Sequence, residues 1–360
     1  GRSLDPDTNG YTSESFEEGT VGLDMTLSLF EGFSRINQVR FRKMNKERSE
    51  WELKEKQNEL AYQVTDAYYK LILERKLLDL ALEQSRLSER YLKQTEVFVE
   101  LGLKSASDLQ EVKARREGDI YRYQSRGNSS RIALLHLKQL MNIQPGDTLA
   151  ILDTITASQV PPYSVSTVET LYAQSIEILP SIRMIDLKQK AAHKEYAIAG
   201  GAFSPSVFAR FTVGANYYNT AFSARQLRDN IGKYVGVGIS FPLLSGLQRL
   251  TNQRKLKLNM YRLKNEEELE KQQLYTDIEQ TLLSLHTGYS EHQQALSQLD
   301  AETLVLKESE RKWEEGLISV FQLMEARNRF IAAKAELVRV RLQIEMMMKL
   351  EKYYRQGTFL

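Results

Sequence analysis

Three short segments of the chain alternate between hydrophobic residues and small or polar ones. Residues 21–29, 206–217 and 234–243 each place a hydrophobic side chain at every second position, and Phe208 is the main exception on the polar side. A period of two matches the spacing of side chains on one face of a β-strand. We therefore predict three strands, each with one apolar face and one small or polar face.

Two much longer runs follow the helical period. Residues 34–101 contain no glycine or proline, and residues 247–315 contain only Gly288. At about 1.5 Å per residue, a continuous helix of either length would reach about 100 Å, several times the span of a compact domain. Each run stops at a glycine, and a second helical run follows it to about Asn142 or Tyr354. The pattern predicts two long helical hairpins, with Ser105 or Ser107 capping the first return helix.

The remaining segments predict loops and shorter helices. Residues 1–19 are rich in acidic, hydroxyl and glycine residues and are expected to form a loop. Residues 145–180 are expected to form a loop or a small strand pairing near residues 150–152, followed by a short helix over about 167–174. Pro180 opens a further helix that ends near Gly200 and Gly201. A polar loop is predicted over residues 219–230.

The two units of strand and hairpin repeat each other. Val21, Gly32, Arg35 and Gly102 correspond to Val235, Gly246, Arg249 and Gly316, each pair being 214 positions apart. Chance does not preserve one offset over about 95 positions without an insertion. We therefore predict a chain built from a duplicated strand, helix, turn and helix.

Composition excludes several classes of function. The chain has 49 basic and 47 acidic residues, a net charge of +2, which gives no indication of nucleic-acid binding. It contains no cysteine, which excludes disulfides, thiol catalysis and cysteine-based zinc sites. The sequence contains no run of 18 apolar residues, so no membrane-spanning helix is predicted. The first residues also lack the apolar core of a signal peptide. Strands of a membrane β-barrel need only about 9 to 11 alternating residues each.

Two interpretations of the apolar strand faces are open. In a soluble sheet such a face packs on a core, which is the default for any one strand. In an outer-membrane barrel the face meets lipid, between girdles of aromatic residues. Aromatic residues do occur at the strand ends, although a core would use them equally well. They are Phe30, Phe33, Tyr217, Tyr218, Phe222, Tyr234 and Phe241.

No catalytic, metal or cofactor site is predicted. The histidines His136, His193, His286 and His292 have no carboxylate partners at metal-ligand spacing. The segment around Gly236 and Gly238 lacks the third glycine of a dinucleotide-binding loop. No nucleophile with a base and an orienting partner can be nominated, so we expect a protein that is not an enzyme.

Each reversal between the long helices is followed by polar residues three positions apart, which share one helical face. Carboxylates favour the first turn of a helix for electrostatic reasons alone, and spacing by itself favours this simpler interpretation. The alternative is that several copies meet at the end of a tube and form a charged ring, which selects cations or is closed by nearby Arg or Lys. The residues are Asp108 and Glu111 after Gly102, and Gln322 and Glu325 after Gly316.

The order of these motifs resembles the TolC-type outer-membrane efflux factors over nearly all of residues 1–355. The resemblance depends on two junctions, two turns, one helix-to-strand passage and both ends of the chain. These motifs are Leu29–Phe33, Leu243–Leu247, Gly102–Leu109, Gly316–Leu323, Ala197–Ser206, Asp5–Pro6 and Glu351–Tyr354.

The resemblance implies a homotrimer that shares one β-barrel in the bacterial outer membrane, continued by a periplasmic tube of antiparallel helices. It implies a periplasmic membrane-fusion adaptor and an inner-membrane efflux pump as partners, and no nucleic acid. The tip turns expected to dock the adaptor are Gly102, Leu103, Ser105, Gly316, Leu317 and Ser319. The expected membrane girdle is Phe30, Tyr217, Tyr218, Tyr234 and Phe241. Elementary physics also favours an oligomer, because three strands cannot close a barrel and open edges are costly in lipid.

The sequence departs from the family pattern at two places. The family carries two gate carboxylates on the second return helix, and these positions fall on Gln322 and Glu325, of which the first is not acidic. Charge from Asp108 and Glu111 is expected to supplement the ring. The family also begins with a signal peptide, a helix and a first strand, which have no counterpart here. We expect the numbering to begin within a truncated or processed product.

The sequence thus predicts a mainly α fold with a β-barrel part, made of two internal repeats. Its function is expected to be a passive exit duct in a tripartite efflux or type I secretion system. The alternative is a soluble coiled-coil scaffold or adaptor with a small capping sheet. The expected segments are a surface loop and strand (1–33), a first hairpin (34–144), an equatorial region (145–179), a helix leading to the barrel (180–203), strands with an external loop (204–244), a second hairpin (245–354) and a tail (355–360).

Overall fold

The computed structural model describes residues 2–4, 9–13, 17–144, 146–152, 160, 166–219, 224–229, 231–243 and 247–359. The chain divides into two compact units. The sheet unit contains residues 1–49 and 185–267, and the hairpin unit contains residues 50–184 and 268–360. The two longest helices belong partly to each unit, and each unit is described by itself.

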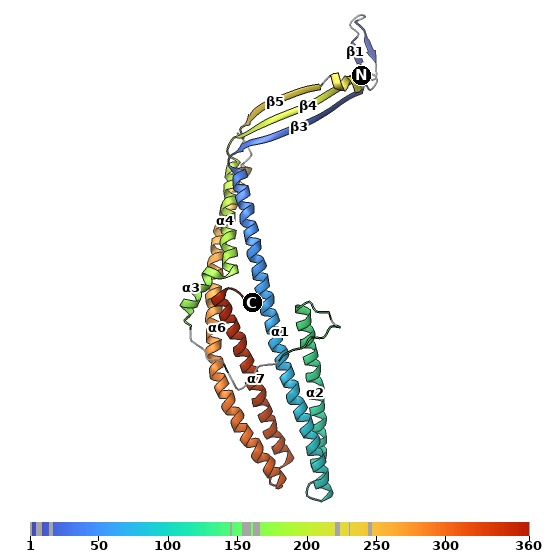
Figure 1. The fold of residues 1–360 in the computed structure, drawn as a ribbon, viewed down its shortest axis with the longest axis vertical. Helices are drawn as coiled ribbons and strands as arrows, with labels where there is room; N and C mark the ends of the chain where they lie inside the picture. The colour runs from blue at the N-terminus through green and yellow to red at the C-terminus, as the bar shows by residue number, and fades with distance from the viewer. Residues whose placement is uncertain are drawn as a thin grey trace. The chain divides into compact units, whose positions relative to one another are not determined.

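The sheet unit is built around a three-stranded antiparallel sheet in the order β3-β4-β5 (Figure 1). Its strands are β3 (Glu17–Glu31), β4 (Ser206–Asn219) and β5 (Ile231–Ser240). The central strand β4 pairs with both neighbours, with Met25 opposite Phe211 and Phe211 opposite Val235. The pairing of β3 with β4 shifts register between Ser28 and Phe30. The three predicted strands are therefore confirmed, and they lie side by side.

The register sorts the side chains into the two faces that the alternation predicts. One face is apolar except for Lys233 and carries Val21, Leu23, Met25 and Leu27 with their partners on β4 and β5. The other face carries glycine, serine, threonine, Asp24 and Arg210. Phe208 belongs to this second face, where its ring covers the space that a side chain at Gly238 would need. Tyr234 covers Gly236 in the same way.

The structure corrects three predictions around the sheet. Residues 2–4 and 11–13 form the paired strands β1 (Arg2–Leu4) and β2 (Tyr11–Ser13), and β3 starts at Glu17, so a loop over 1–19 is wrong. Short hairpins can form through backbone hydrogen bonds without the apolar pattern used for the prediction. The short helix α5 (Ala224–Asp229) lies within the predicted loop. Strand β5 begins at Ile231 and ends at Ser240, earlier than predicted at both ends, and Pro242 beyond its end has no N–H to donate to a ladder.

Three helical segments complete the sheet unit. They are the beginnings of α1 (Ser34–Glu100) and α6 (Gln248–Glu314), and most of α4 (Pro180–Gly201). The hydroxyl of Ser34 donates to the carbonyl oxygen of Ile198 over 3.1 Å, which ties α1 to α4. The amide of Gln189 donates to the carbonyl oxygen of Leu263 over 3.3 Å, which ties α4 to α6.

The junction between β3 and α1 depends on close backbone approach. Gly32 has a φ of +57°, and a Cβ placed there would lie 2.5 Å from the carbonyl oxygen of Gly201. Phe33 and Leu247, which are 214 positions apart, also have positive φ angles of 62° and 63°. The junction glycine that the sequence analysis pairs with Gly32, Gly246, lies outside the described residues.

The hairpin unit contains most of both long helices and their return helices, α2 (Ala106–Leu140) and α7 (Val320–Gln356). Helices α1 and α6 have 67 residues each, and both pairs of helices begin 214 positions apart. A shorter helix, α3 (Val168–Ile178), packs against α7. Residues 146–152 form no strand, so the loop expected there is the correct alternative.

Three hydrophobic clusters hold the hairpin unit together. The largest joins α3, α6 and α7 and includes Leu171, Ile278 and Ile344. A second lies beside the two turns between helices, and a third packs Leu71 of α1 against Leu137 of α2. Among the described residues, no helix combines the length and hydrophobicity needed to cross a membrane.

Candidate functional site

The turn between α1 and α2 is fixed by its backbone. Gly102 has a φ of +70°, which glycine adopts without the penalty of a side chain. The N–H of Gly102 donates to the carbonyl oxygen of Val99 over 3.0 Å, and that of Leu103 donates to the carbonyl oxygen of Phe98 over 2.8 Å. These bonds satisfy carbonyl groups that the end of a helix leaves without partners. Leu103 remains exposed.

The turn between α6 and α7 repeats this geometry. Gly316 has a φ of +75°, and the N–H of Leu317 donates to the carbonyl oxygen of Lys312 over 2.8 Å. Leu317 is exposed like Leu103. The two turns therefore present the same backbone and similar side chains, and we call them the tips.

Each return helix begins with a capping box. The hydroxyl of Ser105 accepts from the N–H of Asp108 over 3.1 Å, and the N–H of Ser105 donates to the Asp108 carboxylate over 2.9 Å. Ser319 and Gln322 exchange the same bonds over 3.2 and 3.0 Å. The structure therefore selects Ser105 over Ser107 as the cap. A glutamine serves this motif as well as an acid does.

The capping box also stabilises the charged form of Asp108. Hydrogen bonds from the backbone N–H and the hydroxyl of Ser105 lower the pKa of Asp108 below its ordinary value of 3.8. The carboxylate is thus ionised at neutral pH and engaged with its own helix.

The other two predicted site residues point to solvent. Glu111 is exposed and makes no hydrogen bond or ion pair with a described residue. Glu325 is exposed, and its Oε1 lies 3.8 Å from Nη1 of Arg329. The Nε of Arg329 lies 3.5 Å from Oε2 of Glu302. The four candidate gate residues therefore fall into two pairs, with Asp108 and Gln322 capping helices and Glu111 and Glu325 exposed outside the capping boxes.

An aromatic cluster connects the two tips. Trp313 of α6 is buried and packs edge-on against Tyr91 of α1, with ring centroids 5.2 Å apart. Its centroid lies 5.7 Å from that of Phe98. Val112 of α2 and Leu323 of α7 complete the cluster. All four long helices thus contribute to one core beside the turns, so the tips pack together.

A buried polar network lies next to this cluster. Arg327 of α7 is 2% exposed and donates to the backbone carbonyl of Gln84 over 2.7 Å. Its guanidinium carbon lies 5.6 Å from the Tyr91 ring centroid, and the Tyr91 hydroxyl donates to Glu310 over 2.9 Å. Burial lowers the pKa of Arg327 and raises that of Tyr91. The network therefore links α1, α6 and α7 around the buried guanidinium of Arg327, which has few hydrogen-bond partners.

Asp119 extends this network to α2. Its carboxylate accepts from the Gln84 amide over 2.9 Å and from the Ser88 hydroxyl, and it lies 3.3 Å from Arg122. Because Asp119 is buried, these bonds are needed to offset its desolvation.

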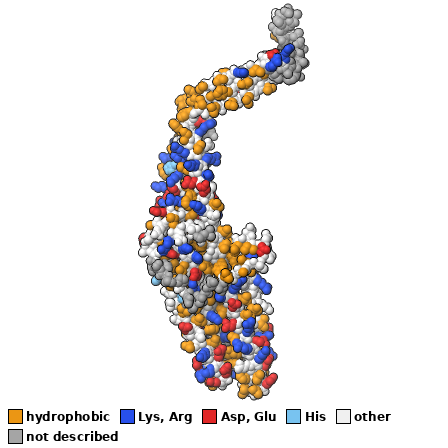
Figure 2. Space-filling model, viewed as in Figure 1, with side chains coloured by type: hydrophobic (Ala, Val, Ile, Leu, Met, Phe, Trp, Pro, Cys, Tyr) orange, Lys and Arg blue, Asp and Glu red, His pale blue; other side chains and the backbone are white. Residues whose placement is uncertain are grey.

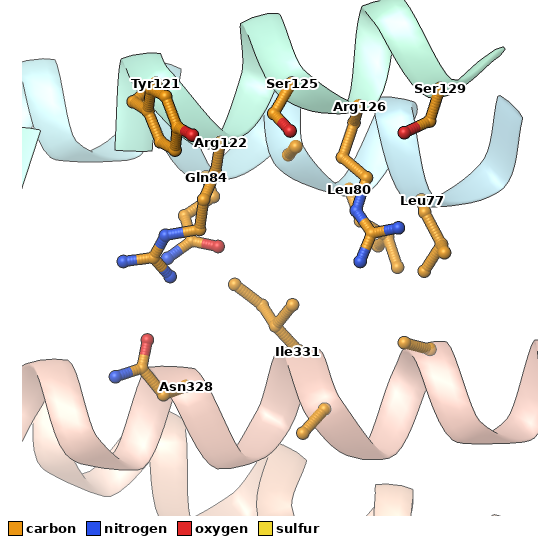
Figure 3. A pocket seen from close by; sticks show the side chains of 13 residues that line it. Leu77, Leu80, Gln84, Tyr121, Arg122, Ser125, Arg126, Ser129, Asn328 and Ile331 are labelled. Atoms are coloured by element: carbon orange, nitrogen blue, oxygen red, sulfur yellow. The ribbon is translucent and has the colours of Figure 1, made fainter. Parts of the chain in front are cut away.

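A groove of about 570 Å³ lies between α1, α2 and α7. Figure 3 shows Arg122 and Arg126 extending from α2 into this groove, opposite Asn328 and Ile331 of α7. Arg126 lies 3.3 Å from Glu74, and Arg122 is paired with Asp119. Both cations lining the groove are thus accompanied by carboxylates.

The apolar face of the sheet is exposed in the single chain. Leu23 is 68% exposed, and Val235 and Val237 are 71% exposed. Figure 2 shows hydrophobic side chains covering the strands. Strands β3 and β5 each pair only with β4 among the described strands, so both edges of the sheet carry backbone groups without strand partners. An exposed apolar face is typical of a surface that contacts another molecule, and open strand edges are typical of a sheet that pairs with further strands.

The predicted girdle residues are distributed unevenly. Phe30 lies near the end of β3 and packs edge-on against Phe33, with ring centroids 5.3 Å apart. Phe241 follows β5 and is exposed, whereas Tyr234 lies on the small and polar face. Tyr217 and Tyr218 belong to the far end of β4, where only the backbone is described.

Comparison with protein families decides the identity of this architecture. A family model for outer membrane efflux proteins matches residues 1–142 and 171–346. The chain belongs to the outer membrane efflux protein family. A search of curated protein sequences finds no significant match to this member of the family.

Solved structures of outer-membrane channels share the fold of this family member. The Campylobacter jejuni CmeC outer membrane channel superposes with a TM-score of 0.82 at 13% identity, covering 99% of this chain and 75% of that one. VceC of Vibrio cholerae gives 0.80 at 14%, covering 96% and 88%. The open state of Neisseria gonorrhoeae MtrE gives 0.75 at 16%, covering 97% and 81%.

The buried clusters beside the tips of this outer membrane efflux protein were not predicted from the sequence. The sequence analysis did not single out Trp313, Arg327 or Asp119, whose partners lie on other helices. The offset of 214 contained one usable signal, because Asp119 corresponds to the uncharged Ala333, whereas Arg327 corresponds to the equally basic Lys113. Positions where a repeated chain breaks its own symmetry with a charge are worth inspecting for a specific contact.

Proposed function

We propose that the protein is a passive exit duct of the bacterial outer membrane, serving a tripartite efflux or type I secretion system. Strands from several identical chains would form a barrel in the membrane, and the helical hairpins would form a tunnel in the periplasm. Energy would come from an inner-membrane pump. The proposal combines membership of the outer membrane efflux protein family with the geometry of the sheet and the tips.

The observation that carries this proposal is the exposed apolar face of the sheet. Burying a side chain such as Val235 or Leu23 away from water stabilises a protein by roughly 1.5–3 kcal/mol. A row of such residues left in water on three neighbouring strands would favour aggregation. Lipid covers this face, and the small and polar face then lines an aqueous bore, as in known outer-membrane barrels.

The open edges of the sheet support a homotrimer. Every unsatisfied backbone group in a bilayer costs several kcal/mol, so β3 and β5 need further strands beside them. Copies of the same chain supply them with cyclic symmetry. The 214-residue offset between matched helices suggests a duplicated unit, which would give the tunnel wall near-equivalent hairpins within each chain.

The tips suit a docking and gating role at the periplasmic end. Their exposed leucines, Leu103 and Leu317, offer apolar contacts to a membrane-fusion adaptor, with Gly102, Ser105, Gly316 and Ser319 setting the turns. We assign the gate charge to Glu111 and Glu325, because Asp108 and Gln322 are engaged in capping.

Adjacent residues on β3 provide a direct test of the membrane assignment. The chain contains no cysteine, so single cysteines at Met25 and Thr26 can be labelled with a fluorophore without background. Met25 lies on the apolar face and Thr26 on the polar one. In vesicles, we expect lipid-borne nitroxide to quench the probe of Met25→Cys, and aqueous iodide to quench that of Thr26→Cys.

The scaffold alternative gives a different result. A soluble coiled-coil protein with a capping sheet would fractionate with the aqueous phase, and nitroxide lipids would quench neither probe. That outcome would overturn the proposed function.

A further inference from the structure

The beginnings of α1 and α6 are strongly basic. Residues 34–49 contain six basic residues and one acidic residue, and residues 248–264 contain six basic residues and no acidic one. Four of the basic positions recur at the 214-residue offset. They are Arg35, Arg40, Lys43 and Arg48, matched by Arg249, Arg254, Lys257 and Arg262. The whole chain has a net charge of only +2, so the charge is concentrated here.

Most of these basic side chains have no ion-pair partner among the residues that the structure describes. Arg40, Lys43, Arg254 and Lys257 make no ion pair or hydrogen bond with any described residue. Neither helix carries an acidic residue in its first turn, where the helix dipole would favour one. We call these four side chains the basic collar. Like charges clustered near the helix starts create a positive potential that attracts anionic partners.

The collar lies directly below the apolar face of the sheet. Phe33 and Leu247, which immediately precede the two helices, are both exposed, so the apolar surface continues to the helix starts. Figure 2 shows Lys and Arg side chains gathered over the ends of α1, α4 and α6 that adjoin the hydrophobic strands. At about 1.5 Å per residue, Arg40 and Arg254 each lie only about 9 Å from the first residue of their helix.

Helix geometry directs these side chains toward the sheet. Both helices start at the sheet, and side chains on a helix tilt toward its N-terminus. Arg and Lys therefore extend back toward the membrane boundary with their apolar stems along the surface. Exposed Val39 and Leu258 lie among the cations, which gives the mixed apolar and basic surface typical of segments at a lipid interface.

We propose that the basic collar binds the anionic head groups of phospholipids in the periplasmic leaflet of the outer membrane. This inference rests on the proposed function, because it requires the sheet to lie in a bilayer. The head-group layer is about 5–7 Å thick, so cations just below the apolar face reach its phosphates. The collar thereby sets the depth of the barrel and gathers anionic lipid around it.

The test removes the collar charge and measures bound lipid. The full-length protein is reconstituted in phosphatidylethanolamine bilayers with about one phosphatidylglycerol in five lipids, and the ratio of the two in the lipid that remains bound is determined. The collar variant carries four substitutions: Arg40→Gln, Lys43→Gln, Arg254→Gln and Lys257→Gln. A matched control removes four exposed charges of the hairpin unit: Arg90→Gln, Lys93→Gln, Arg131→Gln and Lys307→Gln.

We expect the parent and the control to enrich phosphatidylglycerol about threefold or more over the bulk bilayer, and the collar variant to lose this enrichment. Equal enrichment in the collar variant would overturn the proposal. A collar variant that keeps its lipid enrichment but becomes more selective for potassium over chloride than the parent would place these cations in the bore instead, which also overturns the proposal.

The proposed function is tested separately in the same samples. A parent that inserts and conducts without enriching phosphatidylglycerol refutes the lipid proposal alone. A parent that stays in the aqueous fraction refutes both.

Discussion

The residues that begin α2 and α7 separate two roles that the sequence leaves together. Asp108 and Gln322 close capping boxes with Ser105 and Ser319, and either an acid or an amide serves there. Glu111 and Glu325, one turn further along, point to solvent. Asp108 and Gln322 therefore have a structural role at the helix starts, and only Glu111 and Glu325 are proposed for the gate.

The two capping boxes should respond differently to acid. The pKa of Asp108 is lowered in the folded state, so its contribution to stability is present above the ordinary value of 3.8 and is lost as the pH falls through the lowered pKa. Gln322 does not titrate. Hydrogen exchange corrected for intrinsic rates should show residues 106–110 opening between pH 7 and pH 3 more than residues 320–324. Asp108→Asn should remove the difference, and equal opening in the parent would contradict the assignment.

Neutralising the proposed gate should raise conductance. If Glu111 and Glu325 from several copies surround the narrowest point, Glu111→Gln with Glu325→Gln removes the charges that hold cations and pair with neighbouring Arg or Lys there. Single-channel recordings should show a higher conductance than the parent. Glu169→Gln with Glu279→Gln is the matched control, since both residues are exposed and lie away from the tips. An unchanged conductance would remove Glu111 and Glu325 from the gate.

At the scale of elements, long helices and strand faces were predictable because each follows one period over many residues. The helix predicted over 34–101 is α1, and the one from Pro180 to Gly200–Gly201 is α4. The β1–β2 hairpin and α5 were missed because short elements depend on backbone pairing and neighbours. The Trp313 cluster and the Arg327 network were missed because their partners lie on helices distant in sequence.

Two glycines with similar φ angles should differ in their tolerance of a side chain. At Gly102 nothing lies within 4 Å of a built Cβ, so Gly102→Ala should cost only about 1–2 kcal/mol for the left-handed backbone. At Gly32 a Cβ would also clash with backbone at 2.5 Å, so Gly32→Ala should cost about 3 kcal/mol or more. Thermal unfolding monitored by circular dichroism should rank Gly32→Ala well below Gly102→Ala. Equal unfolding midpoints for the two variants would show that the backbone around Gly32 can shift to accommodate a Cβ.

Trp313 should be essential to the packing of the tips. Trp313→Ala removes the ring that contacts Tyr91 and Phe98 and should cost about 3–5 kcal/mol. Limited proteolysis near residues 101–105 and 315–319 should accelerate. Trp51→Ala is the control, because Trp51 contacts Lys54 on its own helix and lies outside this cluster. Unchanged cleavage at the tips would mean that they do not depend on this core.

At the scale of the whole molecule, one chain leaves surfaces that identical chains would cover. The sheet exposes its apolar face and two edges, and family membership gives that surface a membrane context. The amphipathic pattern alone allowed both a soluble core and a lipid contact. The exposed face within the sheet unit and the family match together favour lipid.

The most direct test is current through a planar bilayer that contains the purified full-length protein. A duct built from several chains should give discrete conductance steps of one unitary size, and the detergent-solubilised particle should have the mass of three chains. A particle of one chain that produces no steps would contradict the central claim that copies of this chain assemble into a water-filled duct.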